Sequence, residues 1–147
     1  MTDSTAQDTG ILYLLRTVRS IAVIGASANE ARPSHGVMKF LIGHGYAVHP
    51  VNPGHAGGTI LGRTVFGSLS EIPSAIDMVD IFRNSEAAGA VVDEAIALAA
   101  EKGIRAVWMQ LGVINEAAAE KARAAGLIVI MDRCPKIEYA RQRVNGR

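Results

Sequence analysis

The stretch VIGASANEARPSHG, residues 23–36, joins an apolar run to small residues and an arginine. Residues 25–27 are Gly-Ala-Ser, which lets the backbone turn tightly, so that its N–H groups and the Ser27 hydroxyl can approach an anion. A helix that begins near residues 33–34 would present unpaired N–H groups and a partial positive charge. Arg32, just before it, could add a charge-assisted hydrogen bond. The pattern favours a phosphate site; a plain strand-to-helix turn with a surface arginine is the alternative.

A nicotinamide or flavin dinucleotide is the first ligand that such a loop suggests, and two features oppose it. Ser27 stands where the dinucleotide motif has its second glycine, which permits close approach of the pyrophosphate. The apolar run that ends at Val51 is followed by Asn52 and Pro53. Dinucleotide-binding folds place Asp or Glu near there for the ribose hydroxyls. An NAD(P)-binding oxidoreductase is therefore the alternative and not the favoured interpretation.

Apolar runs alternate with helical stripes along the chain and define the elements that position this loop. The strands are predicted at residues 21–24, 47–51, 76–82, 104–109 and 127–131. Because they are apolar on both faces, we predict an α/β, Rossmann-like, doubly wound parallel sheet in the order 3-2-1-4-5, with helices on both faces. Ligands of such sheets bind where the winding direction changes. We expect that crevice between the loops that follow the first and fourth strands.

The organisation around the sheet is simple. Residues 1–147 are predicted to form one domain, because a chain of this length can bury most of its surface in a single core. Residues 1–7 are expected to be loose, and Thr9 could cap a first helix that reaches about residue 19. Gly, Pro and Ser throughout residues 52–74 predict a long loop with one short helical turn.

Composition excludes several classes of function. The chain is 49% hydrophobic and 20% charged, with a formal net charge of +1, as expected for a soluble globular protein. We expect no nucleic-acid partner, because no basic footprint is present. No apolar segment approaches the ~20 residues that cross a bilayer, so no membrane partner is expected. The single cysteine precludes an internal disulfide, which predicts a reducing, cytoplasmic location.

The stretch PVNPGHAGGTILGRTVFGSL, residues 50–69, resembles the CoA-binding domain of the succinyl-CoA synthetase alpha chain. In that family a proline-flanked loop after the second strand runs into Gly-Gly-Thr, Leu-Gly and a Val-Phe pair. The segments IFRNSE (81–86), WMQLGV (108–113) and MDRCP (131–135) are closer still to small single-domain CoA-binding proteins. With the turn at 25–27, five motifs occur in the family's order, and the resemblance covers nearly the whole chain from Ile21 onward.

The resemblance implies a ligand, coenzyme A or an acyl-CoA, whose pyrophosphate and ribose 3′-phosphate need several donors and a cation. The glycine turn and the helix start match the family's phosphate cradle, and Asn52 and Pro53 match its nucleotide-side loop. Where the synthetase commonly has a lysine, this chain has His55, so a phosphate contact there would be weaker and pH-dependent. The residues predicted to bind CoA are Gly25, Ala26, Ser27, Arg32, Pro33, Ser34, Asn52, Pro53, His55, Phe82, Arg83, Gln110 and Gly112.

Three of these residues follow later strands. Phe82 could lie against the adenine ring, with simple core packing as the alternative, and Arg83 could reach a phosphate. Gln110 leaves the fourth strand with its amide facing the crevice, where contact with the pantetheine arm or the thiol end is favoured. Trp108 lies within that strand, and core packing is favoured for it.

Other reactive side chains do not form a catalytic or metal site in the sequence. The four histidines fall on different predicted elements without ligand spacing, so no metal site is predicted. Asp77 and Asp80 would face opposite sides of one strand and therefore form no acid/base pair. Cys134 follows the fifth strand at the binding edge; a buried structural thiol is favoured, and a mixed disulfide with CoA is the alternative.

The favoured function is a CoA-binding protein without chemistry of its own. In the synthetase the phosphorylated histidine belongs to a further domain, and we expect no such domain here, nor a substitute nucleophile and base. The alternatives are a CoA-ligase-like subunit that acts with a partner enzyme chain, and an interaction module whose pocket is vestigial. The sequence leaves open whether the chain forms a homo-oligomer and which acyl group it prefers.

Overall fold

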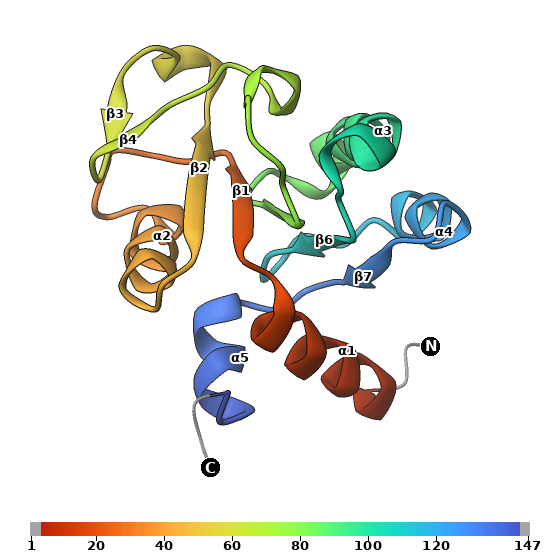
Figure 1. Ribbon diagram of the computed structural model, residues 1–147. Coiled ribbons are helices and arrows are strands. Elements are labelled where there is room, and N and C mark those ends of the chain that lie inside the picture. Colours follow the sequence, from red (N-terminus) through yellow and green to blue (C-terminus); the bar gives the residue numbers. More distant parts are fainter. Residues whose placement is uncertain (1–3, 145–147) are drawn as a thin grey trace.

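A computed structural model describes residues 4–144 and shows a five-stranded parallel sheet with helices on both faces (Figure 1). Two short strands form a separate hairpin. The elements in chain order are α1 (Ser4–Thr17), β1 (Ser20–Ile24), α2 (Pro33–Gly43), β2 (Ala47–Val51), η1 (Pro53–His55), β3 (Thr59–Ile60), β4 (Arg63–Thr64), η2 (Leu69–Glu71), β5 (Met78–Ile81), α3 (Ser85–Lys102), β6 (Ala106–Met109), α4 (Glu116–Ala124), β7 (Ile128–Ile130) and α5 (Pro135–Arg141).

The strands are buried on both faces because successive side chains point to opposite sides of the sheet. On β6, Ala106 and Trp108 belong to a core that includes buried residues of α1, α2 and α5. Val107 and Met109 belong to a second core, formed with α3 and α4. All four side chains are fully buried. The prediction of an α/β fold with a parallel sheet between two helical layers is confirmed.

The predicted strand order is wrong. The sheet has the order β2-β1-β5-β6-β7, which in the numbering of the predicted strands is 2-1-3-4-5 instead of 3-2-1-4-5. The third predicted strand, β5, pairs with β1, with Ile21 opposite Met78 and Ile24 opposite Ile81. It does not lie outside β2.

Pro50 gives the physical reason for this order. Proline has no N–H to donate to a ladder and is therefore confined to edge strands. Pro50 is the fourth of the five residues of β2, which makes β2 unsuited to an interior position. The outer edge of β2 is instead covered by the long loop: the Phe66 N–H donates to the Pro50 carbonyl at 3.0 Å, and the Asn52 N–H donates to the Phe66 carbonyl at 2.9 Å.

The corrected order moves the point where the winding direction changes. After β1 the chain turns to one side to form β2, and it then returns past β1 to form β5. The crevice therefore lies between the loops that follow β1 and β5, and not between those that follow the first and fourth predicted strands. The loop after β6 lies one strand further along the same edge.

The ends of the elements differ in part from the prediction. Helix α1 begins at Ser4 and not near Thr9, so residues 4–7, predicted to be loose, are helical. The rest of that prediction, residues 1–3, lies outside the described residues. The loop of residues 52–74 contains two 3-10 turns and the β3–β4 hairpin, one helical turn more than predicted. None of the helices described has the length and hydropathy that crossing a bilayer requires.

Asp80 is a carboxyl group in the interior of the sheet. It lies on β5 between Val23 of β1 and Trp108 of β6 and is fully buried. Neither of its oxygens has a hydrogen-bond partner among residues 4–144. Burial raises the pKa of Asp80 well above its usual range, because the charged form loses its hydration. The folded protein therefore holds a proton on Asp80 at pH values where the unfolded chain releases it.

Asp80 should make the protein less stable as the pH rises. Because the folded state binds the proton more tightly, the free energy of unfolding falls above the ordinary carboxyl pKa and until the folded carboxyl ionises. In the Asp80→Asn variant the side chain at residue 80 cannot ionise, so the variant lacks this fall in the free energy of unfolding. In urea unfolding between about pH 5 and pH 8, wild type should lose stability relative to Asp80→Asn by up to ~1.4 kcal/mol per pH unit. Identical pH slopes in the two proteins would contradict this prediction.

Candidate functional site

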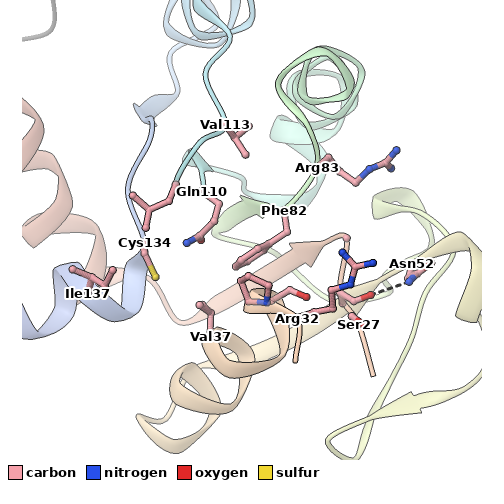
Figure 2. A pocket seen from close by; sticks show the side chains of 15 residues that line it. Ser27, Arg32, Val37, Asn52, Phe82, Arg83, Gln110, Val113, Cys134 and Ile137 are labelled. Atoms are coloured by element: carbon pink, nitrogen blue, oxygen red, sulfur yellow. Dashed lines mark hydrogen bonds between the residues drawn. The ribbon is translucent and has the colours of Figure 1, made fainter. Parts of the chain in front are cut away.

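A cavity of about 660 Å³ opens at the carboxyl edge of the sheet (Figure 2). It lies between the loops that follow β1, β5 and β6, and the first turns of α2 and α5 border it. Its volume falls in the range of small-molecule sites. Ten of the thirteen residues predicted from the sequence line it: Gly25, Ala26, Ser27, Arg32, Pro33, Ser34, Asn52, Phe82, Arg83 and Gln110.

The other three predicted residues do not line the cavity. Pro53 and His55 form the exposed turn η1, next to Asn52. Gly112 lies in the loop after β6 with a positive φ of 81°. Its N–H donates to the Asp132 carboxylate at 2.8 Å, so that it links this loop to the turn before α5.

Gly25 lies where the loops after β1 and β5 come into contact. Its φ is +86°, a conformation that other residues rarely adopt. A Cβ atom at this position would lie 2.4 Å from the backbone carbonyl oxygen of Phe82. Glycine is required at this point both for its conformation and for the close approach of the two loops.

The turn after β1 does not offer all the donors expected of it. The N–H groups of Gly25 and Ala26 donate to the Val51 carbonyl oxygen, at 3.0 Å and 3.2 Å, and are thus used within the protein. The Ser27 hydroxyl accepts a hydrogen bond from the Asn29 N–H at 3.0 Å. Asn52 donates from Nδ2 to the Ala26 carbonyl at 2.8 Å, which ties the loop after β2 to this turn (Figure 2). The turn therefore supplies shape and space more than free N–H donors.

The N-terminus of α2 has unused hydrogen-bonding capacity. Helices α3 and α4 are capped by Asn84 and Asn115, whose side chains accept hydrogen bonds from the first turn. The N-cap residue of α2 is Arg32, which makes no such bond, and Pro33 follows it. Pro33 has no N–H, and the His35 N–H donates to the Arg32 carbonyl at 3.1 Å, so the free donor of this turn is the Ser34 N–H, for which an anion in the cavity can be the acceptor.

Two arginines border the cavity from different loops. Arg32 precedes α2, and Arg83 follows β5; both are exposed and line the cavity. Among residues 4–144, neither guanidinium group forms a hydrogen bond or an ion pair, because the ion pairs of this region join other side chains. Unpaired guanidinium groups beside a helix N-terminus form a positive region suited to phosphate.

The other end of the cavity is largely apolar. Figure 2 shows Val37, Val113, Cys134 and Ile137 around this end, away from the two arginines. Gln110 is the polar exception: it is only 6% exposed, and its Oε1 has no hydrogen-bond partner among the described residues. The cavity thus changes along its length from cationic and polar to apolar.

Sequence reasoning left five lining residues out of the predicted site: Val37, Leu111, Val113, Cys134 and Ile137. Leu111 and Val113 lie in the WMQLGV motif, of which the predicted site includes only Gln110 and Gly112. Cys134 was placed at the binding edge, because every parallel strand ends at that edge, but a structural role was favoured for it. Ile137 had no signal beyond its position one turn after the fifth strand.

Trp108 and the acidic residues agree with the sequence analysis. Trp108 is fully buried, does not line the cavity, and donates from Nε1 to the Arg133 carbonyl at 2.9 Å. Asp77 accepts hydrogen bonds from the Arg19 and Ser20 N–H groups, whereas Asp80 is enclosed in the core. The two carboxylates therefore lie in separate environments and do not act as a pair.

The chain belongs to the CoA-binding domain family, whose model matches residues 19–140. It is 38% identical over 133 residues to the uncharacterized protein YneT of Bacillus subtilis, covering 88% of this chain and 92% of YneT. The solved structure of a hypothetical protein from Pyrococcus horikoshii is 38% identical, with a TM-score of 0.84, and the match covers 92% of this chain and 91% of that one.

A third relative is a ligase. The alpha subunit of an ADP-forming acetate–CoA ligase from Pyrococcus furiosus is 35% identical over 100 residues. That match covers 65% of this chain but 21% of the ligase subunit, so it relates this chain to one portion of the enzyme. The predicted membership in the CoA-binding family and the relation to ligase alpha subunits are confirmed.

Replacing Gly25 should destabilise the fold. Gly25→Ala forces a side chain into a positive φ and against the Phe82 carbonyl, which should cost roughly 1–3 kcal/mol or more in the free energy of unfolding. Gly36→Ala is the matched control, because a Cβ there meets no atom within 4 Å. Within helix α2 it should be neutral or stabilising by roughly 0.5–1 kcal/mol. Chemical denaturation of both variants measures the difference, and equal midpoints would refute the steric role of Gly25.

Proposed function

We propose that this protein binds coenzyme A or an acyl-CoA in the cavity beyond β1 and β5, without catalysis of its own. The observation that carries the proposal is the pair of unpartnered arginines, Arg32 and Arg83, at one end of a cavity whose other end is apolar. CoA has the same division, with phosphates on the adenosine side and an uncharged arm that ends in a thiol.

The cationic end suits the phosphates. The pyrophosphate and the ribose 3′-phosphate together carry several negative charges, which two guanidinium groups and the uncapped start of α2 can stabilise. Gly25 holds the two loops that carry these arginines together, because its missing side chain leaves room for the Phe82 carbonyl. His55, predicted as a phosphate contact, lies outside the cavity lining and is not included in the proposed site.

The remaining surfaces suit the adenine ring and the pantetheine arm. Phe82 is partly buried and lines the cavity between the arginines and the apolar end, where an aromatic ring can stack on it (Figure 2). The arm contains amide groups, and Gln110 offers an amide partner in an otherwise apolar surrounding. The arm would therefore run from Phe82 toward Cys134.

The lining residues support a binding role without catalysis. The ionisable side chains among them are Arg32, Arg83 and Cys134, and within residues 4–144 no histidine, aspartate or glutamate lines the cavity. General acid–base catalysis needs a group that exchanges protons near the working pH, which arginine does not do. A delivery or sensing role for CoA fits this set of residues.

A ligase-like role with a partner chain is the second candidate. The related acetate–CoA ligase subunit is one observation in its favour, and the apolar rim is another, because Leu111 and Ile137 line the cavity and are 53% and 51% exposed. A partner enzyme could cover this rim and act on the thiol. Copurification of a stoichiometric second chain from the native host would support this role, and recovery of the chain alone would count against it.

Calorimetric titration should show that CoA binds and that NADP does not. Arg32→Ala and Arg83→Ala should each weaken CoA binding about tenfold or more, ~1.4 kcal/mol, because each removes an unpaired cation from the phosphate end. Arg123→Ala is the matched control: it removes an exposed arginine from α4, away from the cavity, and should leave the Kd unchanged. Absence of heat with CoA at about 1 mM would overturn the proposed function.

The phosphate contacts can be separated by comparing ligands. 3′-Dephospho-CoA should bind more weakly than CoA, since it lacks one anionic group. If an arginine contacts the 3′-phosphate, its Ala variant should bind both ligands with similar affinity. If both variants retain the full difference between the two ligands, neither guanidinium group contacts that phosphate.

A further inference from the structure

Cys134 is the single cysteine of the chain and lines the cavity at its apolar end. It is 6% exposed and is the N-cap residue of α5, where its side chain makes no capping hydrogen bond. Because it is buried and also lines the cavity, molecules in solution reach the thiol through the proposed ligand site. This combination separates Cys134 from a purely structural core cysteine.

The turn that carries Cys134 is held against the end of β6. The Arg133 N–H donates to the Met109 carbonyl at 3.3 Å, and the Trp108 indole donates to the Arg133 carbonyl at 2.9 Å. The Asp132 carboxylate accepts the Gly112 N–H at 2.8 Å. These three bonds attach residues 132–133 to β6 and its loop, so the thiol has a defined position in the cavity.

Gln110 is an independent indication of a ligand beside this thiol. It is more than nine-tenths buried, lines the same cavity, and its side-chain amide has no hydrogen-bond partner among residues 4–144. Such a buried polar group without a partner is uncommon in folded proteins, and Figure 2 shows its amide nitrogen directed into the cavity. A ligand arm with an amide carbonyl close to a terminal sulfur would accept from this nitrogen and bring that sulfur to Cys134.

We propose that Cys134 is a site of reversible disulfide formation with the bound thiol carrier, a proposal that rests on the proposed function. The co-reactant is the oxidised carrier, a CoA disulfide. The Cys134 thiolate attacks one sulfur of that disulfide, the carrier S–S bond breaks, and a new S–S bond joins Cys134 to one CoA. The second CoA leaves as a thiolate and takes up the proton that Cys134 released to solvent, so Cys134 is oxidised and one CoA is reduced.

The test is a time course of the intact mass of the purified protein with CoA disulfide, reduced CoA or pantethine, and with dithiothreitol added afterwards. CoA disulfide should add the mass of one CoA less two hydrogen atoms, and dithiothreitol should remove it. Reduced CoA without oxidant should add nothing. Pantethine, the disulfide of the arm without the nucleotide, should react at least about tenfold more slowly, because it lacks the phosphates that hold the carrier in the cavity.

Two controls assign the reaction to the cavity. Cys134→Ala should form no adduct with CoA disulfide. An excess of desulfo-CoA, which retains the phosphates and lacks the thiol, should protect Cys134 in the wild-type protein. Arg83→Ala should slow the reaction with CoA disulfide and leave the pantethine rate unchanged.

The outcomes separate this proposal from the proposed function. Heat of CoA binding without an adduct, or equal rates with CoA disulfide and pantethine, would overturn the role of Cys134 and leave CoA binding intact. No adduct and no heat would overturn both. A fast adduct that desulfo-CoA prevents would establish Cys134 as a redox-sensitive site within the cavity.

Discussion

The contact between Gly25 and the Phe82 carbonyl is the constraint on which the rest of the site depends. It joins the loops after β1 and β5 at the point where the winding direction of the sheet changes. A side chain at residue 25 would push these loops apart, because the carbonyl oxygen would lie 2.4 Å from its Cβ. Arg32 and Arg83 follow these two loops, so their approach to one cavity depends on this contact. The cavity is thus a product of backbone packing, and its charge comes from the side chains placed around it.

The polarity of the cavity changes along its length for a simple reason of topology. The loops after β1 and β5 supply the arginines, whereas the loop after β6 and the start of α5 supply Val113 and Ile137. Strand order therefore sets the order of charged and apolar groups along the edge. Under the proposed function, the anionic half of the carrier would face the first two loops and its uncharged arm the last two, with Phe82 between them.

Much of the fold could be predicted because its signals are local. The apolar runs predicted all five strands of the sheet. The strand order could not be read from local pattern alone. Pro50 carries the missing information, since a proline inside a strand indicates an edge of the sheet. The start of α1 was also misplaced, because helix boundaries depend on packing as well as on capping residues.

The sequence by itself determined the class of fold, the family, and most of the residues around the cavity, because motifs at strand ends must gather at one edge of a parallel sheet. Only the tertiary structure decided which of these residues line the same cavity and which N–H groups remain free to bind a ligand. It showed that the Gly25 and Ala26 N–H groups donate to the Val51 carbonyl, and that His55 does not line the cavity. The reason is physical: hydrogen-bond partners and enclosure depend on contacts between residues distant in the chain, and no local pattern encodes them.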